Sequence, residues 1–116
     1  MNANAKKWVQ ALRSGKYKQA HGTLGKEDGS RCCLGVLCDL AVEAGVIKTF
    51  NLYSTCLPEE VTMWAGLSSD QGAYGRNLAL WRDNDGGWVD GKVNSPKRFK
   101  TIARIIESEP EGLFVK

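Results

Sequence analysis

The sequence has no apolar run approaching the length of a membrane-spanning helix, and its first residues, Met1 to Lys7, are polar. We therefore expect neither membrane insertion nor a secretory signal, and the cytoplasm as the compartment. The chain also lacks internal repeats and low-complexity tracts. Its 116 residues, of which 42% are hydrophobic, predict one folded domain over 1–116 rather than a disordered chain.

The sequence also lacks a large excess of positive or negative charge. The net charge is +3 and the isoelectric point about 8.7, and no dense basic stripe is present. A dedicated nucleic-acid-binding domain carries such a stripe, so nucleic acid is not the expected partner. A small anionic ligand or an acidic protein surface fits this mild basic balance.

The four cysteines lack the spacing of a metal site. Cys32 and Cys33 are adjacent, Cys38 follows five residues later, and Cys56 is isolated, whereas structural zinc sites use ligand pairs two residues apart. Adjacent side chains diverge, and the single histidine, His21, adds only one more ligand. We expect no metal or other cofactor, and free thiols packed as small hydrophobic side chains.

A cysteine nucleophile is the alternative interpretation. Cys32 or Cys33 lies where a helix is predicted to begin, which lowers the pKa of a thiol, and His21 on the preceding segment could act as a base. The apolar surroundings raise the pKa of a thiol instead, and no residue that would orient His21 is evident. We assign no catalytic residue and leave enzymatic activity open, with a binding protein preferred.

Apolar periodicity and end signals predict four helices, at 4–14, 33–44, 58–66 and 96–108. The second is apolar on almost every side, which is typical of a buried central helix. A β-hairpin is predicted from Tyr17–Leu24 and Ser30–Cys33, and a minor one from Trp88–Gly91 with the residues before it. Residues 67–77 are predicted to form a loop, and 78–82 fit either a helical turn or a strand. The fold class is a small α+β domain.

The start of the last helix is the favoured ligand site. Ser95 is the predicted N-cap, Pro96 the first helical residue, and Lys97 and Arg98 fill the first turn. Cations there oppose the helix dipole, so they concentrate positive charge beside free backbone N–H groups, an arrangement that suits phosphate or carboxylate. Two further lysines flank the segment, Lys92 and Lys100. The alternative is a solvated basic face.

Loop aromatics suggest how a base could stack beside that charge. Trp88 follows two glycines in a polar turn, and Tyr74 lies near Arg76 in a glycine-rich loop, so both are candidates for stacking. Anchoring of the loop onto the core is the commoner role for such residues. Trp8 and Trp64 are assigned to the core.

Acidic residues also cluster around the glycine turn. Asp83, Asp85 and Asp90 could bind a divalent cation, but the full calcium-loop pattern is absent. Aspartates in turns normally serve backbone hydrogen bonds, so this is the weakest candidate site.

The chain resembles a group of small, mostly uncharacterised proteins of tailed bacteriophages along most of its length. The shared features are a tryptophan-led helix with a Ser-Gly-x-Tyr-x-Gln step at Trp8–Gln19, the block Cys-Cys-Leu-Gly-Val-Leu-Cys-Asp-Leu at Cys32–Leu40, a Leu-Pro-x-x-Val…Trp-Ala-Gly-Leu helix at Leu57–Leu67, and a Phe-x-x-Ile-Ala-x-x-Ile helix at Phe99–Ile106. The cysteine block is the distinctive one.

One segment departs from that group. Its members reach the last helix through a Leu-x-x-Leu-Asn-Asp turn, where this chain has Leu-Ala-Leu-Trp-Arg-Asp at Leu78–Asp83, and Asp85–Asn94 resembles an insertion. The resemblance implies a phage accessory protein acting in the host cytoplasm, and it supplies no activity to transfer.

The functional hypothesis follows from the charges and this resemblance. We expect a protein that sequesters an anionic, nucleotide-like ligand, for instance a host immune signal, through Ser95, Lys97, Arg98 and the residues near them. An inhibitor of a host protein and a small hydrolase of a nucleotide signal remain as alternatives. Association into a homo-oligomer also stays open.

Overall fold

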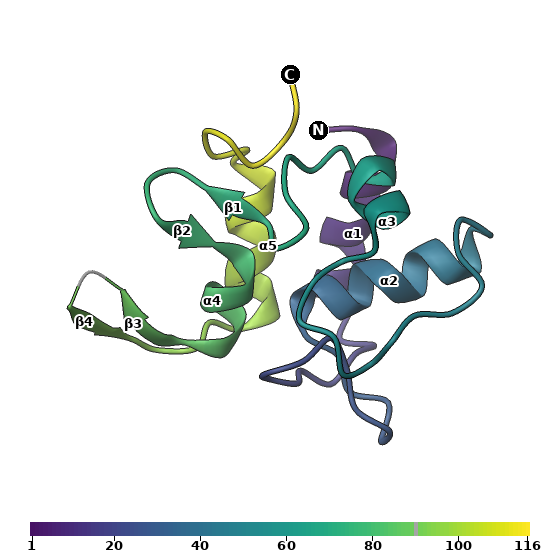
Figure 1. The fold of residues 1–116 in the computed structure, drawn as a ribbon, viewed down its shortest axis with the longest axis horizontal. Helices are drawn as coiled ribbons and strands as arrows, with labels where there is room; N and C mark the ends of the chain where they lie inside the picture. Colours follow the sequence, from purple (N-terminus) through teal and green to yellow (C-terminus); the bar gives the residue numbers. More distant parts are fainter. Residues whose placement is uncertain (90) are drawn as a thin grey trace.

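A computed structural model describes residues 1–89 and 91–116, with five helices and two two-stranded antiparallel sheets among them (Figure 1). The α+β class is confirmed. In chain order the elements are α1 (Ala3–Arg13), α2 (Cys33–Glu43), α3 (Glu59–Trp64), β1 (Ala73–Tyr74), β2 (Leu78–Ala79), α4 (Leu80–Asp85), β3 (Gly87–Val89), β4 (Lys92–Asn94) and α5 (Phe99–Glu107).

Helix α2 is the centre of the fold. It packs against α1, α3 and α4, while α5 packs against α1 and α4 on the side away from α3 (Figure 1). The residues of α2 from Cys33 to Cys38 are all buried, as expected for a helix that is apolar on nearly every side. The indole of Trp8 on α1 is fully buried and its Nε1 donates to the carbonyl of Cys33 at 2.8 Å. This bond fixes the start of α2 against α1.

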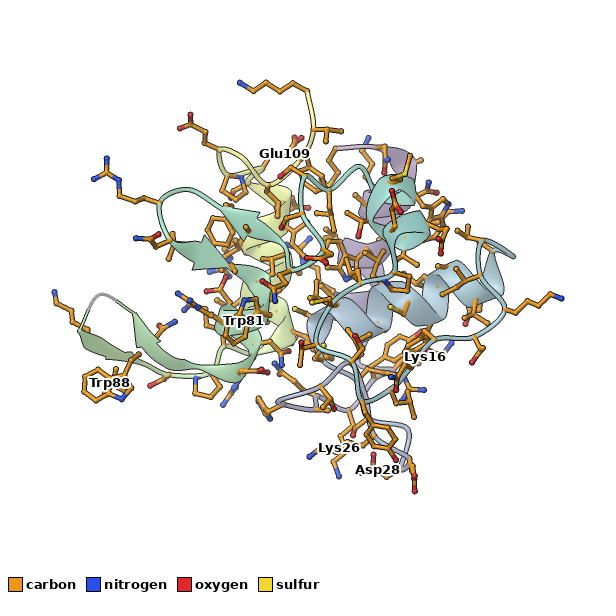
Figure 2. All side chains as sticks on the ribbon, in the orientation of Figure 1. Lys16, Lys26, Asp28, Trp81, Trp88 and Glu109 are labelled. Carbon is orange, nitrogen blue, oxygen red and sulfur yellow. The ribbon has the colours of Figure 1, made fainter. Side chains whose placement is uncertain are left out.

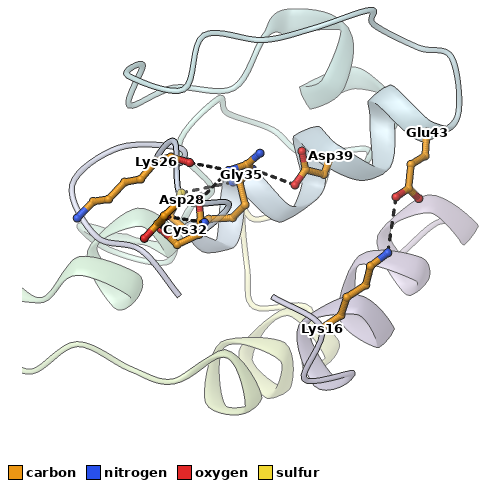
Figure 3. A network of polar contacts seen from close by, with 9 residues as sticks. Lys16, Lys26, Asp28, Cys32, Gly35, Asp39 and Glu43 are labelled. Atoms are coloured by element: carbon orange, nitrogen blue, oxygen red, sulfur yellow. Dashed lines mark hydrogen bonds and ion pairs between the residues drawn. The ribbon is translucent and has the colours of Figure 1, made fainter. Parts of the chain in front are cut away.

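The first turn of α2 lies unusually close to the preceding loop. An added Cβ at Gly35 would lie 1.8 Å from the carbonyl oxygen of Leu24, so only glycine fits there. Cys32 is the N-cap, and its Sγ accepts from the backbone N–H of Gly35 at 3.4 Å. Arg31, which precedes α2, forms an ion pair at 2.9 Å with Asp39 in the second turn of the helix (Figure 3 shows Asp39 on α2).

The predicted hairpin of Tyr17–Leu24 with Ser30–Cys33 is wrong. These residues form only isolated bridges, in which Arg31 pairs with Gln19 in the parallel sense and with Gly25 in the antiparallel sense. The chain bends between those two partners, with Gly22 at φ +92°. No continuous second strand therefore runs alongside the first: the carbonyl oxygen of Leu24 accepts from the N–H of Cys32 at 3.0 Å, but the N–H of Leu24 donates to the carbonyl oxygen of Ser54 at 2.8 Å.

Two short hairpins form elsewhere. The segment 67–77, predicted as a loop, contributes β1, which pairs with β2. The undecided stretch 78–82 contains both β2 and the beginning of α4. Trp88 is in a strand as predicted, but it pairs with Val93 after it rather than with residues before it. The glycines at 86 and 87 turn the chain away from α4, which leaves only the following segment within reach.

The last helix begins later than predicted. Its first residue is Phe99, its N-cap is Arg98, and no side chain caps it. Ser95 and Pro96 therefore precede the helix, in extended chain. The backbone N–H of Lys97 donates to the carbonyl oxygen of Asp83 at 2.7 Å, which draws this segment against α4. The buried stripe of α5 is as predicted, and among the described residues no helix combines the length and apolarity needed to cross a membrane.

Candidate ligand-binding cleft

A fully buried asparagine, Asn84, positions α4 against the rest of the domain. Its Oδ1 accepts from the backbone N–H of Cys33 at 3.0 Å and from Gln19 Nε2 at 2.9 Å. Its Nδ2 donates to the carbonyl of Ala20 at 2.8 Å and to Asp85 Oδ1 at 2.9 Å. The amide thus makes all four of its hydrogen bonds and joins α4, the start of α2 and the loop between α1 and α2.

The neighbouring Asp83 is also buried, and it organises the opposite side of α4. Its Oδ2 accepts from the Tyr74 hydroxyl at 2.6 Å, and its Oδ1 lies 3.3 Å from Lys97 Nζ. Burial raises the pKa of the Tyr74 phenol, and the hydrogen bond to Asp83 raises it further. Lys97 Nζ also donates to Asn94 Oδ1 at 3.2 Å. One carboxylate therefore ties β1 and the segment before α5 to α4.

A cleft of about 410 Å³ opens beside this group. It is lined by residues of β1, β2, α4, the β4 strand and the segment after it: Tyr74, Leu78, Asp83, Lys92, Val93, Asn94 and Lys97. The volume lies within the range of small-molecule pockets. Aliphatic and aromatic groups together with two ammonium groups form its walls, so it can hold a ligand with a flat body and an anionic end.

The two lysines of the cleft differ in availability. Lys97 Nζ is half-buried and faces a carboxylate at 3.3 Å, so much of its charge is already balanced. Lys92 is exposed and, among the described residues, has no acidic partner within 4 Å. Lys92 is therefore the cation that an anionic ligand in the cleft would meet first.

Only part of the predicted ligand set lies in the cleft: Tyr74, Lys92 and Lys97. Ser95, Arg98 and Lys100 are exposed outside its lining, because α5 starts at Phe99 and the segment before it runs past the cleft. The predicted placement of Ser95 at the N-cap and of Lys97 and Arg98 in the first turn of that helix is therefore wrong.

The remaining two predicted residues lie on hairpins. Arg76 is exposed in the turn between β1 and β2. Trp88 is 70% exposed, as predicted, and lies at the outer edge of the β3–β4 hairpin (Figure 2). Tyr74 differs from its prediction, since its half-buried ring and its bond to Asp83 make it a structural anchor as well as a cleft wall.

The cysteine nucleophile does not fit the structure. Cys33 is fully buried, its Sγ lies 3.6 Å from the carbonyl oxygen of Leu80, and burial raises its pKa. Burial also raises the pKa of Cys32 to about 11. The proposed base, His21, is exposed. Thiols that hold their protons this firmly are poor nucleophiles, and the four cysteines are free rather than bridged.

The aspartates of the predicted acidic cluster at the glycine turn do not share one site. Asp83 faces Tyr74 and Lys97, whereas Asp85 accepts from Asn84, and Asp90 lies outside the described residues. Within the described part of the chain no three His, Cys, Asp or Glu side chains are grouped as metal ligands.

Sequence reasoning missed the buried polar pair Asp83 and Asn84. A signal was present, since both directly follow the apolar run that begins at Leu78. It also missed a second, smaller pocket on the other side of α4, which is lined by Trp81, Asp85, Cys32 and residues of three loops.

Comparison with known proteins identifies one family. Residues 1–110 match the family described as Domain of unknown function (DUF8296), and the chain belongs to it. No curated protein and no solved structure matches the chain.

Proposed function

We propose that this member of the DUF8296 family is a binding protein that sequesters an anionic, nucleotide-like ligand in the cleft between the two hairpins. The observation that supports the proposal is the meeting of Tyr74, Lys92 and Lys97 around one cavity of about 410 Å³. The proposal includes a role as a phage accessory protein in the host cytoplasm that removes a host immune signal. That part is drawn from the resemblance to phage proteins.

The chemistry of the cleft suggests how such a ligand would lie. Lys92 would meet the phosphate, because it is exposed and unpaired among the described residues. The apolar side chains of Leu78 and Val93 would cover the flat body of the ligand. Lys97 and Asp83 would stay paired at the floor, where the carboxylate can also accept from an amino group of a base.

Isothermal titration calorimetry with cyclic and linear nucleotide second messengers tests the proposal. We expect one of them to bind to the wild type, and Lys92→Glu to weaken that binding at least about tenfold, since it replaces attraction of the phosphate by repulsion. Lys48→Glu, at an exposed loop lysine, makes the same charge change and should leave binding unaltered. The absence of binding by every nucleotide, or equal losses for the two variants, contradicts the proposal.

A specific observation favours inhibition of a host protein as a second candidate. Trp88 and Val93 are directly opposite each other in the β3–β4 hairpin, and they are 70% and 69% exposed. Tryptophan is enriched among the residues that dominate protein interfaces. The neighbouring Lys92 adds positive charge, so an acidic protein surface would be complementary.

Affinity capture from host lysate tests this second function. Wild-type protein should recover one stoichiometric partner, and Trp88→Ala should lose it, because a buried interface tryptophan contributes more than about 2 kcal/mol. Met63→Ala, at an equally exposed residue of α3 (71%), is the matched control and should retain the partner. Retention by both variants rules out the hairpin as the contact surface.

A further inference from the structure

The smaller pocket on the other side of α4 is a separate site, and we propose that it binds a single planar nitrogen heterocycle carrying an amino group, the chemistry of free cytosine. The pocket has a volume of about 160 Å³ and is lined by Gly22, Thr23, Cys32, Leu34, Thr55, Gln71, Trp81 and Asp85. It shares no lining residue with the hairpin cleft, so this inference does not depend on the proposed function.

The pocket is layered from an apolar floor to an open mouth. Cys32 and Leu34 form the floor and are buried. Trp81 and Asp85, one turn apart on α4, are half-buried in the wall (Figure 2 shows Trp81 beside this helix). Thr55 is exposed at the mouth. This gradient directs the flat part of a ligand inward and leaves its substituents near water.

The size of the pocket limits the ligand to one ring. An engineered cavity of about 150 Å³ in another protein accepts benzene, and this pocket is slightly larger at about 160 Å³. The indole of Trp81 provides an aromatic surface for the ring. The space beside Gly22 is open, since an added Cβ there would meet no atom within 4 Å. A six-membered ring fits inside the pocket, and the sugar and phosphate of a complete nucleotide would have to lie outside it.

The polar groups of the pocket select for hydrogen-bond donors. Asp85 Oδ1 accepts from Asn84, whereas its second oxygen has no donor and the carboxylate no cationic partner among the described residues. Gln71 Nε2 donates only to Cys56 Sγ, a weak acceptor, at 3.5 Å. An amino group of the ligand would supply Asp85 with the donor it lacks, and Gln71 is available to turn toward the ring.

An anion is excluded by the same geometry. The pocket adjoins the N-terminus of α2, whose free N–H groups often bind anions. Here Asn84 accepts from the N–H of Cys33 at 3.0 Å, and Cys32 Sγ accepts from that of Gly35 at 3.4 Å (Figure 3 shows the Cys32–Gly35 contact). Two of the N–H groups of this helix terminus are therefore already bonded within the protein, and Asp85 repels negative charge. The favoured ligand is neutral or cationic.

NMR titration of the ¹⁵N-labelled protein with cytosine, uracil and benzene tests the proposal. We expect cytosine to bind with a dissociation constant of roughly 1 mM, since so small a ligand has few atoms to contribute, and to shift the Trp81 indole signal. Uracil lacks the amino group and benzene has no polar atoms, so both should bind at least about fivefold more weakly.

Two variants separate the carboxylate from the shape of the pocket. Asp85→Asn keeps an oxygen to accept from Asn84 but removes the charge, so cytosine should bind at least about tenfold more weakly. Thr55→Trp should block the mouth and abolish binding. Glu59→Gln and Thr49→Trp make the same kinds of change at exposed residues outside the pocket lining, and both should bind cytosine like the wild type.

The proposal is overturned by no shift with cytosine up to its solubility limit, by equal affinity for the three probes, or by unchanged binding by Asp85→Asn. Shifts confined to the β3–β4 hairpin would place the ring in the other cleft and equally refute this site. Thermal melting of each variant shows whether it is folded, and Thr55→Trp, at an exposed residue, keeps the test decisive if Asp85→Asn unfolds.

Discussion

At the scale of single residues, two positions tolerate almost no alternative. Gly35 permits the first turn of α2 to touch the carbonyl oxygen of Leu24, where an added Cβ would lie at 1.8 Å. Asn84 connects three segments through four hydrogen bonds from a fully buried amide. Position 35 requires a residue without a side chain, and position 84 requires a side-chain amide that can make all four hydrogen bonds.

Replacing Asn84 by alanine should lower the free energy of unfolding by about 3 kcal/mol or more, because the buried N–H of Cys33 and carbonyl of Ala20 each lose a partner. Urea unfolding followed by circular dichroism measures this loss. Asn51→Ala, at an exposed asparagine that accepts only from the backbone of Tyr53, should cost about 1 kcal/mol or less. A loss for Asn84→Ala as small as that of the control would show that the amide is not the connection we describe.

At the scale of elements, the junction between α4 and the β3–β4 hairpin places the hairpin, and with it the cleft. Gly86 ends α4 with φ +77°, and an added Cβ would lie 2.7 Å from the carbonyl oxygen of Asn94 and 2.8 Å from Pro96 Cδ. The close contact holds β3 against the chain that leaves β4. The hairpin is therefore oriented by backbone packing at its base.

Gly86→Ala should destabilise the protein by at least about 2 kcal/mol more than Gly15→Ala. Both glycines have φ +77°, but an added Cβ at Gly15 meets nothing within 4 Å, so the difference isolates the steric clash. Thermal unfolding of the two variants measures it. If they melt together, the hairpin base is free to shift, and the cleft is not held by this contact.

At the scale of the whole molecule, the buried thiols make stability depend on alkaline pH. Burial raises the pKa of Cys32 to about 11 and that of Cys38 to about 12, from an ordinary value of 9.0, and raises that of Cys33 as well. A raised pKa in the folded state means that the folded protein holds the proton more tightly. The stability that this tighter binding contributes is complete below pH 9.0, the ordinary pKa of the thiol. It is lost as the pH rises toward the pKa values of the thiols in the folded protein.

From pH 8 to pH 10 each of the three thiols should therefore remove about 1.4 kcal/mol of stability, because the unfolded chain ionises first. Urea unfolding across this range measures the slope. Cys38→Ala leaves a cavity and lowers stability at every pH, but it should reduce the slope by about a third. A slope unchanged by this variant would show that other groups, such as Tyr74, govern the alkaline transition.

The sequence alone predicted the first two helices of this fold closely, but it left the stretch that contains α4 undecided and began the last helix three residues too early. The helices at 4–14 and 33–44 agree with α1 and α2 within one residue at each end, because apolar spacing and flanking glycines are local signals. The strands were predicted poorly. β1 and β2 have two residues each, which is too short for any period, and the segment Tyr17–Leu24 divides its backbone hydrogen bonds between Arg31, Cys32 and the distant Ser54.

The candidate site was also predicted in part from local features of the sequence and missed where it depends on tertiary contacts. Residue types alone indicated Tyr74, Lys92 and Lys97, whose charges and ring are visible in the sequence. Sequence could not show that Asp83 lies among them, because its contacts to Tyr74 and Lys97 are made across three separate elements.

By itself, then, the sequence determined the α+β class, the buried central helix, the free thiols in the core and the exposure of Trp88. These follow from hydrophobicity and from spacing along the chain. Only the tertiary structure decided which cations are paired, where α5 begins and which pockets form. The physical reason is that hydrogen bonds such as that from Lys97 to Asp83 join segments whose proximity arises only after the core has packed.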